Sequence, residues 1–177
     1  MLTIDKLIPQ GHGLAHPLLA RAARVTLDWD TRCKSRFEAT DTAGRRLGVF
    51  LPRGQAVRGG DVLVGEDGSL IHVVAAAQPV LVVRACAAHG SPLDLPRAAY
   101  HLGNRHVPLE VRADHLKLEP DPVLAAMLRA MHLVVSEERA AFEPETGAYA
   151  GHAGAHTHPH GAAHVHDHDH GPDHAGR

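Results

Sequence analysis

Residues 121–142 read DPVLAAMLRAMHLVVSEERAAF, a sequence in which a helix is followed directly by a strand. Asp121 can cap the helix with its side-chain oxygen, and Pro122 suits the first turn, where a backbone N–H is not needed. The apolar residues of the helical half recur at the spacing of one helix face and are Val123, Leu124, Met127, Leu128 and Met131. The segment LVVSEERAAF that follows is predicted to form a strand.

The region before this segment supplies further strands and one more helix. Residues 79–85, PVLVVRA, are rich in β-branched side chains, as is typical of a strand. In SPLDLPRAAYHLGN, Ser91 can act as N-cap, Pro92 can occupy the first helical position, and Gly103 can end the helix. Residues 106–119 contain two short alternating segments, which predict two strands joined by a turn. The resulting order, β-α-β-β-α-β, is that of a ferredoxin-like fold.

The N-terminal part is predicted to be β structure. In RVTLDWD, Val25, Leu27 and Trp29 alternate with polar residues, which is the period-2 pattern of a half-buried strand. Two hairpins are expected, one turning at residues 41–44 and one at residues 66–68, because strand-like runs flank turn residues at both places. No helical stretch stands out in this part. A small antiparallel sandwich or barrel is therefore predicted.

The predicted fold class is α+β, with three consecutive parts. Residues 1–75 are expected to form an all-β domain, and residues 76–150 a ferredoxin-like domain. From about residue 150 the apolar periodicity stops, and Gly, Ala, His, Asp and Pro dominate. Such a composition buries too little apolar surface to offset the entropy lost when a chain becomes ordered. Residues 151–177 are therefore expected to be a disordered, histidine-rich tail.

Composition and charge narrow the classes of function. The 177 residues have a formal net charge of −2 and only 3% aromatic residues, which argues against a nucleic-acid binder. Asp5 and Lys6 interrupt the N-terminus before a signal peptide can form. Gln78 and Pro79 break the longest apolar run well below the ~20 residues of a membrane span. Because the two cysteines form no C-x-x-C pair, we expect a reduced, cytoplasmic protein, with Cys86 as a small buried side chain.

The tail is the most unusual feature of the sequence, because it holds nine of the 17 histidines. HTHPH and HVHDHDH place imidazoles on alternate residues, which share one side of an extended segment. Neutral imidazole binds nickel, zinc and copper, and a flexible chain can wrap several rings around one ion. A purification tag and a functionless low-complexity segment are weaker alternatives, since no six histidines are consecutive and random sequence rarely concentrates so many. The predicted tail ligands are His156, His158, His160, His164, His166, His168 and His170.

A further candidate ligand lies before the tail, in GNRHVPL at residues 103–109. Gly103 permits a sharp turn out of the preceding helix, and Pro108 is expected to hold His106 and Val107 in extended geometry. His106 would then have a fixed direction at a helix-to-strand junction. Taken alone, a single histidine at such a junction is more often structural than a ligand. One imidazole cannot hold a transition-metal ion, but a two-fold dimer would place two copies of His106 around its axis.

The other histidines of the folded part are weaker candidates. His115 is expected to be exposed, and His72 to be a satisfied core or edge residue. No nucleophile–base pair in a recognisable context, phosphate-binding glycine loop or H-E-x-x-H motif occurs in the sequence, which argues against an enzyme. A metallohydrolase that uses His106 and Asp114 as ligands is the weakest alternative.

Three segments of the chain match a known family, namely LPRGQAVRGGDVL, YHLGNRHVPLEV and FEPETGAYAGH, which a histidine-rich end follows. In them the chain closely resembles the urease accessory protein E family, the nickel metallochaperones, over most of residues 1–152. The resemblance implies an N-terminal domain like the peptide-binding domain of a heat-shock co-chaperone. It also implies a ferredoxin-like metal-binding domain that forms a homodimer, with His106 and His152 as metal ligands.

The resemblance also implies a function and partners. We predict a non-enzymatic chaperone that binds Ni²⁺ and donates it during urease metallocentre assembly, although zinc or copper can bind the same ligands. The implied partners are apo-urease and the other urease accessory proteins, one of them a GTPase, with no nucleic acid or membrane. A general divalent-metal buffer or storage protein without a specific client is the alternative. Some relatives carry an auxiliary histidine pair where this chain reads LEPDPV, so that second site is expected to be missing.

Acid release of the metal tests the predicted ligand chemistry. Protons and metal ions compete for the same imidazole lone pair, so histidine protonation below about pH 6 should release the metal. Calorimetric titration with nickel should therefore show much weaker binding at about pH 5 than at about pH 7.5. Equal affinities at the two pH values would contradict ligation by imidazole.

Overall fold

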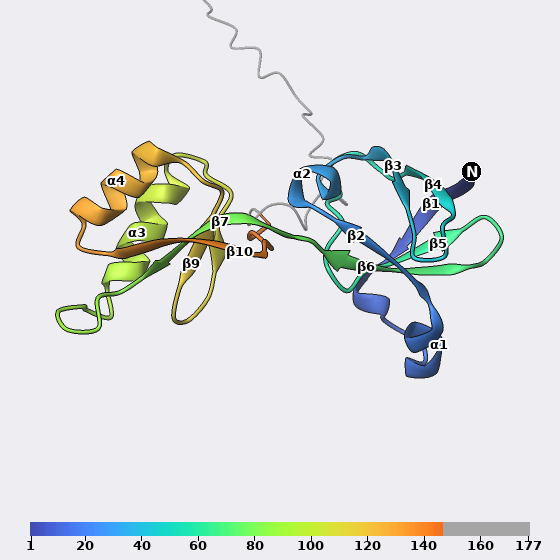
Figure 1. Ribbon diagram of the computed structural model, residues 1–177, viewed down its shortest axis with the longest axis horizontal. Helices are drawn as coiled ribbons and strands as arrows, with labels where there is room; N and C mark the ends of the chain where they lie inside the picture. The colour runs from blue at the N-terminus through green and yellow to red at the C-terminus, as the bar shows by residue number, and fades with distance from the viewer. Residues whose placement is uncertain (147–177) are drawn as a thin grey trace, which may run out of the picture. The chain divides into compact units, whose positions relative to one another are not determined.

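The computed structural model describes residues 1–146, which form two β-sheets with few helices, an α+β arrangement (Figure 1). The histidine-rich tail predicted from residue 151 onward lies outside the described residues. Within residues 1–146, no helix combines the length and the hydrophobicity that crossing a bilayer requires.

A six-stranded sheet occupies the N-terminal part, with the strand order β2-β6-β5-β1-β4-β3. Its strands are β1 (Leu2–Ile8), β2 (Ala23–Leu27), β3 (Arg36–Thr40), β4 (Arg46–Phe50), β5 (Val62–Gly65) and β6 (Leu70–Ala75). Both expected hairpins are confirmed, because β3 pairs antiparallel with β4 and β5 pairs antiparallel with β6. Asp41 stabilises the first of these turns, since its carboxylate accepts hydrogen bonds from the backbone N–H groups of Ala43 and Arg45.

The N-terminal part differs from the expected antiparallel all-β domain in two respects. The sheet is mixed, because β1 pairs parallel with β4 and β2 pairs parallel with β6. Three short helical segments also occur, η1 (Pro9–Gly11), α1 (His16–Arg21) and α2 (Trp29–Arg32). Because α1 buries no side chain, it carries no apolar periodicity that the sequence could reveal. Trp29 was expected on a strand but begins α2, because the Asp28 side chain caps that helix by accepting from the Thr31 N–H.

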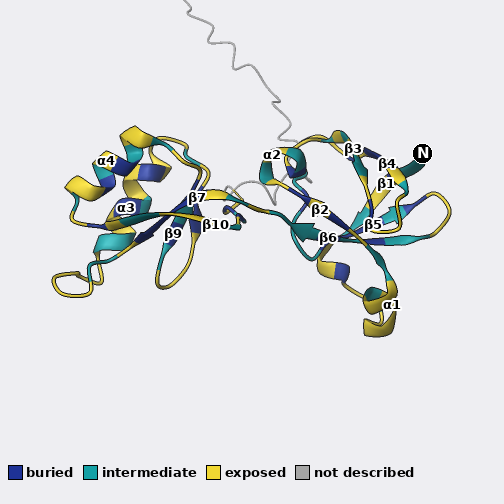
Figure 2. Cartoon of the chain, viewed as in Figure 1, coloured by how far each residue is buried: buried dark blue, intermediate teal, exposed yellow. Residues whose placement is uncertain are grey.

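The core of this part consists of buried aliphatic residues, and Figure 2 colours the buried positions of the chain dark blue. Ile4, Leu47 and Ile71 are each 0% exposed and come from three different strands. Val25 and Leu27 of β2 belong to the same cluster, as their alternation predicts. Full burial of one such side chain stabilises the fold by roughly 1.5–3 kcal/mol, so this cluster is the main stabilising element of the sheet.

A four-stranded sheet forms the C-terminal part, in the strand order β10-β7-β9-β8 and with antiparallel pairing throughout. Its elements in chain order are β7 (Ala77–Arg84), α3 (Asp94–Gly103), β8 (Glu110–Val111), β9 (Leu116–Leu118), α4 (Pro122–Ala130) and β10 (Val134–Ala141). Both helices pack against the sheet, because Leu102 of α3 and Leu128 of α4 share one buried cluster with Leu81, Val83 and Leu118.

The two helices of the C-terminal part begin differently. Asp121 caps α4 as predicted, since its carboxylate accepts from two backbone N–H groups of the first turn at 2.8 and 2.9 Å. Ser91 does not cap α3, which begins later, at Asp94. The Ser91 hydroxyl instead accepts from the Leu93 N–H, and the Asp94 carboxylate accepts from the Ser91 N–H. These bonds close a turn before the helix, so the predicted start of α3 is wrong by one short turn.

A histidine with left-handed backbone conformation follows each of the two helices. His106 follows α3 with a φ of 57°, and His132 follows α4 with a φ of 62°. After α3, the Val107 N–H bonds back to the Leu102 carbonyl, and the equivalent bond follows α4. This pattern is the Schellman motif, in which glycine is the usual left-handed residue. Both positions therefore carry a conformational strain of roughly 1–2 kcal/mol, which the motif's hydrogen bonds and buried neighbours offset.

Replacement of one of these histidines by glycine tests this description. His132→Gly should raise the free energy of unfolding by about 0.5–1 kcal/mol, because glycine adopts positive φ without strain. His101→Gly, inside α3, is the matched control and should lower it by about 0.5 kcal/mol, because glycine is a poor helix former. Urea unfolding followed by circular dichroism measures both effects. Destabilisation of similar size in both variants would contradict the left-handed conformation of His132.

Candidate functional site

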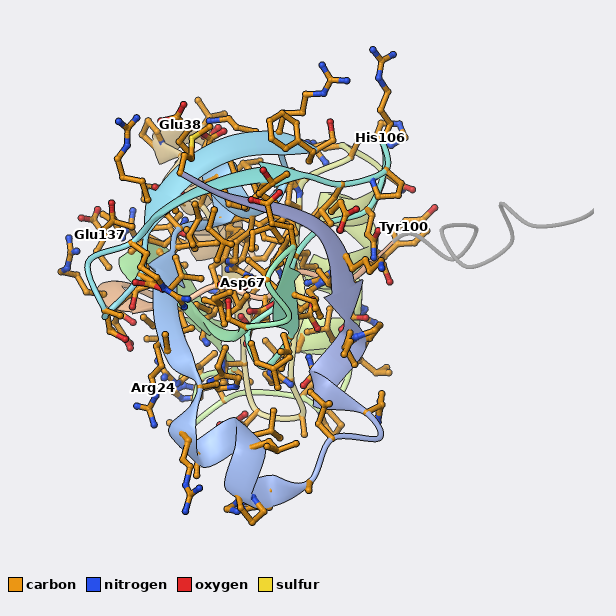
Figure 3. All side chains as sticks on the ribbon, turned by 90° about the vertical axis from the view of Figure 1, so that its right-hand side faces the viewer. Arg24, Glu38, Asp67, Tyr100, His106 and Glu137 are labelled. Atoms are coloured by element: carbon orange, nitrogen blue, oxygen red, sulfur yellow. The ribbon has the colours of Figure 1, made fainter. Side chains whose placement is uncertain are left out.

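His106 presents its imidazole at the surface, just beyond the end of α3 (Figure 3). Contrary to the prediction, its backbone is left-handed rather than extended, and its N–H donates to the Gly103 carbonyl at 2.9 Å. Proline restricts only the residue directly before it, so Pro108 acts on Val107, and the sharp turn falls on His106 itself. The side chain thus leaves a backbone that is fixed by hydrogen bonds on both sides.

The part of the chain that the structure describes contains no complete metal site. Within residues 1–146, no group of three or more His, Cys, Asp or Glu side chains could hold a metal ion. The other predicted ligands lie outside the described residues, and they are His152, His156, His158, His160, His164, His166, His168 and His170. Of the predicted ligands, only His106 is therefore placed by the structure, and one imidazole leaves most of the coordination sphere of a transition-metal ion open.

Residues 142–145, which we call the strap, run beside the segment that follows His106. The Glu145 N–H donates to the Leu109 carbonyl, and the Glu143 N–H donates to the Glu110 carboxylate, both at 2.8 Å. The strap therefore lies against Leu109 and Glu110, three and four positions after His106. The sequence gives no sign of this neighbourhood, because 33 positions separate Glu110 from Glu143 and no local pattern links the two segments.

Glu110 is a buried carboxylate at this junction, with only 2% of its surface exposed. Burial alone would raise its pKa, but hydrogen bonds from the Glu143 N–H, Lys117 and Arg112 outweigh burial and hold the pKa of Glu110 below its usual value. Lys117 approaches the carboxylate to 3.1 Å and Arg112 to 2.9 Å. Glu110 therefore remains charged near neutral pH and accepts strongly from the backbone of the strap.

Two arginines of the N-terminal part hold the strap from another direction. Arg32 is fully buried and donates from Nη1 to the Glu143 carboxylate at 2.7 Å and from Nη2 to the Phe142 carbonyl at 2.6 Å. Burial lowers the pKa of Arg32, and the charge of Glu143 opposes that shift. Arg58 lies 3.3 Å from the same carboxylate and also donates to the Pro144 carbonyl. Charge-assisted hydrogen bonds thus fix the strap at successive residues.

The other histidines that the sequence singled out have structural partners or ordinary positions. His115 is half-buried rather than exposed, and its Nδ1 lies 2.8 Å from the Asp114 carboxylate. His72 is half-buried on β6, as expected of a core or edge position. Asp114 and His106, the ligands of the metallohydrolase alternative, belong to no group of three metal-ligating side chains within residues 1–146.

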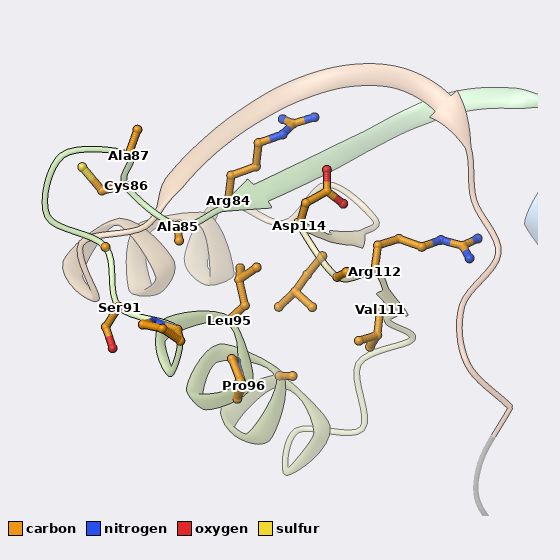
Figure 4. Close-up of a pocket in the computed structure, with 15 residues that line it drawn as sticks. Arg84, Ala85, Cys86, Ala87, Ser91, Leu95, Pro96, Val111, Arg112 and Asp114 are labelled. Carbon is orange, nitrogen blue, oxygen red and sulfur yellow. The ribbon is translucent and has the colours of Figure 1, made fainter.

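A cavity of about 810 Å³ lies where α3 and the loop before it face the turn between β8 and β9 (Figure 4). Its walls are mainly apolar, and its charged lining residues come from the ends of β7 and β8 and from the turn. The apolar lining residues include Leu95, Pro96 and Val111, and the charged ones are Arg84, Arg112 and Asp114. The cavity is therefore shaped by the loops at one edge of the sheet and does not include His106.

Cys86 lines this cavity and pairs with a histidine in the same loop. It is half-buried after the end of β7, whereas a small buried side chain was expected. Its Sγ lies 3.9 Å from Nδ1 of His89, and this hydrogen bond lowers the pKa of the Cys86 thiol. The loop is tight, because the Gly90 N–H donates to the Cys86 carbonyl at 2.7 Å and a Cβ on Gly90 would collide with that oxygen. The turn thus holds the Cys86 thiol and the His89 imidazole close to each other.

Comparison with known proteins matches almost the whole chain. Residues 4–76 match the family model of the N-terminal domain of the UreE urease accessory protein, and residues 78–174 match that of its C-terminal domain. A urease accessory protein UreE from Albidiferax ferrireducens is 65% identical over 175 residues, 99% of each chain. One from Paracidovorax citrulli is 70% identical over 156 residues, 88% of this chain and 73% of the relative. One from Burkholderia vietnamiensis is 52% identical over 162 residues, 92% of this chain and 78% of the relative.

The two cysteines should differ in reactivity. The hydrogen bond between Cys86 and His89 lowers the pKa of Cys86, whereas partial desolvation raises the pKa of Cys33, although Cys33 is the more exposed of the two, and only the thiolate is nucleophilic. Iodoacetamide should therefore alkylate Cys86 several-fold faster than Cys33 near pH 7, and His89→Ala should reduce the difference. The ratio of the two rates should fall as the pH rises toward 9, where both thiols ionise; peptide mass spectrometry measures it. Equal rates near pH 7 would contradict the thiol–imidazole pair.

Proposed function

The chain belongs to the UreE family of urease accessory proteins, and we propose that it is a nickel metallochaperone that delivers nickel during assembly of the urease metallocentre. The observation that carries this proposal is the geometry of His106. Its imidazole is exposed, while the backbone beneath it is held in a Schellman motif. An exposed, oriented imidazole can take up an ion and release it again, because the ion is not enclosed.

We also propose that the C-terminal domain is ferredoxin-like. The chain order β7-α3-β8-β9-α4-β10, together with the antiparallel strand order β10-β7-β9-β8, supports this assignment. We further propose a division into domains at residues 1–75 and 76–150, followed by a tail at residues 151–177. The family matches, which meet between residues 76 and 78, support the first of these two boundaries.

The proposed nickel ligands are His106, His152 and the tail histidines. In a homodimer, two copies of His106 can meet at the two-fold axis and supply two imidazoles. Support for His152 comes from the strap, because the chain leads to it from Glu145, which is hydrogen-bonded to Leu109. Seven residues of chain span at most about 25 Å, and the three from Leu109 back to His106 at most about 11 Å. The further tail ligands are His156, His158, His160, His164, His166, His168 and His170.

The proposed partners follow from the family. We propose that the protein is a cytoplasmic, non-enzymatic homodimer that acts on apo-urease together with the other urease accessory proteins, including a GTPase, and with neither nucleic acid nor membrane. Zinc and copper compete for the same imidazoles, and nickel is favoured as cargo because the relatives are urease accessory proteins.

The second candidate is a general divalent-metal buffer without a client, which the histidine content of the tail favours. Co-purification distinguishes the two functions. A tagged chain mixed with apo-urease and its accessory proteins should retain them if it is a metallochaperone, whereas a buffer should retain none.

Replacement of His106 tests the central ligand. His106→Ala should remove the tightest nickel site and lower the nickel stoichiometry per dimer, because the tail alone cannot replace the paired imidazoles at the axis. His101→Ala is the matched control, since His101 is also exposed and lies near the end of α3, five positions before His106. Isothermal titration of both full-length variants with nickel gives the two stoichiometries. Unchanged stoichiometry in His106→Ala would refute the assignment of His106 as a ligand.

A further inference from the structure

Strand β3 forms one edge of the six-stranded sheet, with β4 as its neighbour there (Figure 1). The two strands pair antiparallel along the whole of β3 without a shift in register. Just beyond its two ends, the Leu51 N–H donates to the Ser35 carbonyl and the Asp41 N–H donates to the Arg45 carbonyl. Because bonded residues alternate along an antiparallel strand, every second residue of β3, counted from Ser35, directs its backbone groups toward β4.

The residues in between, Arg36, Glu38 and Thr40, direct their N–H and carbonyl groups away from β4. Within residues 1–146 no strand pairs with this side of β3, so these backbone groups remain available. An edge strand is often protected by a proline or a bulge, and β3 has neither. The edge can therefore accept an extended backbone as a further strand.

A groove of about 260 Å³ lies beside this edge, and its lining includes Met1, Gly48 and Phe50. Gly48 leaves the strand bare there, because a Cβ at this position would lie 3.1 Å from Cε of Met1 and 3.3 Å from a ring carbon of Phe50. Met1 is 69% exposed and Phe50 47% exposed, which is unusual for such large apolar side chains. An apolar side chain on an added strand would therefore remove apolar surface from water here.

Arg36 gives this edge its charge. It is exposed and lines the groove, and within residues 1–146 it takes part in no salt bridge. The charge of the neighbouring Glu38 is already compensated, because Nη2 of Arg46 donates to its carboxylate at 2.8 Å. An added strand that carries a carboxylate opposite Arg36 is therefore favoured over one that carries a cation.

We propose, resting on the proposed function, that the edge of β3 is a docking surface for an extended segment of a protein partner in urease assembly. The segment adds to β3 as a strand, places an apolar side chain in the groove over Gly48 and pairs a carboxylate with Arg36. A second copy of the chain fits less well. A two-fold pair of β3 edges that uses all three available residues would place Glu38 opposite its own copy, and like charges opposite each other repel.

Hydrogen exchange of single amides in the full-length chain, read by mass spectrometry with electron-transfer fragmentation, tests the added strand. The probes are apo-urease and each of the other urease accessory proteins, mixed with the chain one at a time. In the free chain, the amides of Phe37 and Ala39 should be protected, whereas those of Arg36, Glu38 and Thr40 should exchange freely. A bound partner should slow exchange at these three positions by at least about tenfold. Binding that leaves all three amides unprotected would overturn the proposal.

A proline at position 38 tests the same edge by mutation. E38P removes an N–H that the ladder with β4 does not use, so it should weaken partner binding by at least about tenfold while the sheet still forms. E38T is the matched control, because it also loses the carboxylate but keeps the N–H. It should bind within about twofold of the wild type, since a surface ion pair contributes little. Interferometry with the immobilised full-length chain measures the dissociation constants.

Two further variants keep the proposal testable if E38P does not fold. R36E reverses the charge that faces the partner, and F50S removes an apolar wall of the groove. Each leaves the ladder with β4 intact and should weaken partner binding by roughly three- to tenfold. V123S is their control, because it removes an apolar side chain that is 74% exposed on α4, and it should leave partner binding unchanged.

The outcomes separate this inference from the proposed function. Equal binding by E38P and E38T, or an effect of V123S as large as that of F50S, would overturn the docking surface alone. Protection of the three β3 amides on concentrating the chain by itself would assign the edge to a second copy and would also overturn it. Failure of the proposed function shows itself as a wild-type chain that binds none of these proteins, or as nickel binding that H106A does not alter.

Discussion

A guanidinium group that is shielded from water needs a counter-charge and hydrogen-bond acceptors within the protein. Arg32 is such a group, and the fold of the described residues has to bring those partners to it. It is 0% exposed, and its carboxylate partner, Glu143, lies 111 positions away in the sequence. Leaving such a charge unpaired is strongly unfavourable, so α2 and the strap that follows β10 must be in place together. The pair thus makes the position of the strap a condition of folding.

Local signals in the sequence predicted the elements that local interactions determine. The hairpins at residues 41–44 and 66–68 have turn residues between alternating strands, and Asp121 with Pro122 identifies the start of α4. Strand β1 was not predicted, and the parallel pairing of β1 with β4 depends on contacts between distant segments that no short window contains. The start of α3 was misplaced because Ser91 and Asp94 share a pattern that serves equally well for a helix cap and for a turn.

The candidate site was predictable only where a local pattern in the sequence points to it. The residue type and the neighbours of His106 drew attention to it, yet its conformation was predicted wrongly, since Gly103 looked like the natural left-handed residue at the end of α3. The network around Glu143 was not predicted at all. Arg32, Arg58 and Glu110 are charged residues that read as surface in a linear sequence, and only the packing of the strap buries or half-buries them.

The left-handed backbone at His106 also limits how this position can be redesigned. Side chains branched at Cβ are the least compatible with positive φ, and only glycine, asparagine, aspartate and histidine enter that region with any frequency. Among those four, only histidine offers the borderline nitrogen donor that late first-row metals favour, and only aspartate offers a charged oxygen. A cysteine substituted at this position to supply a thiolate ligand would be disfavoured by the backbone conformation, whatever its effect on metal coordination. The backbone conformation after α3 therefore limits which side chains, and hence which donor atoms, position 106 can carry.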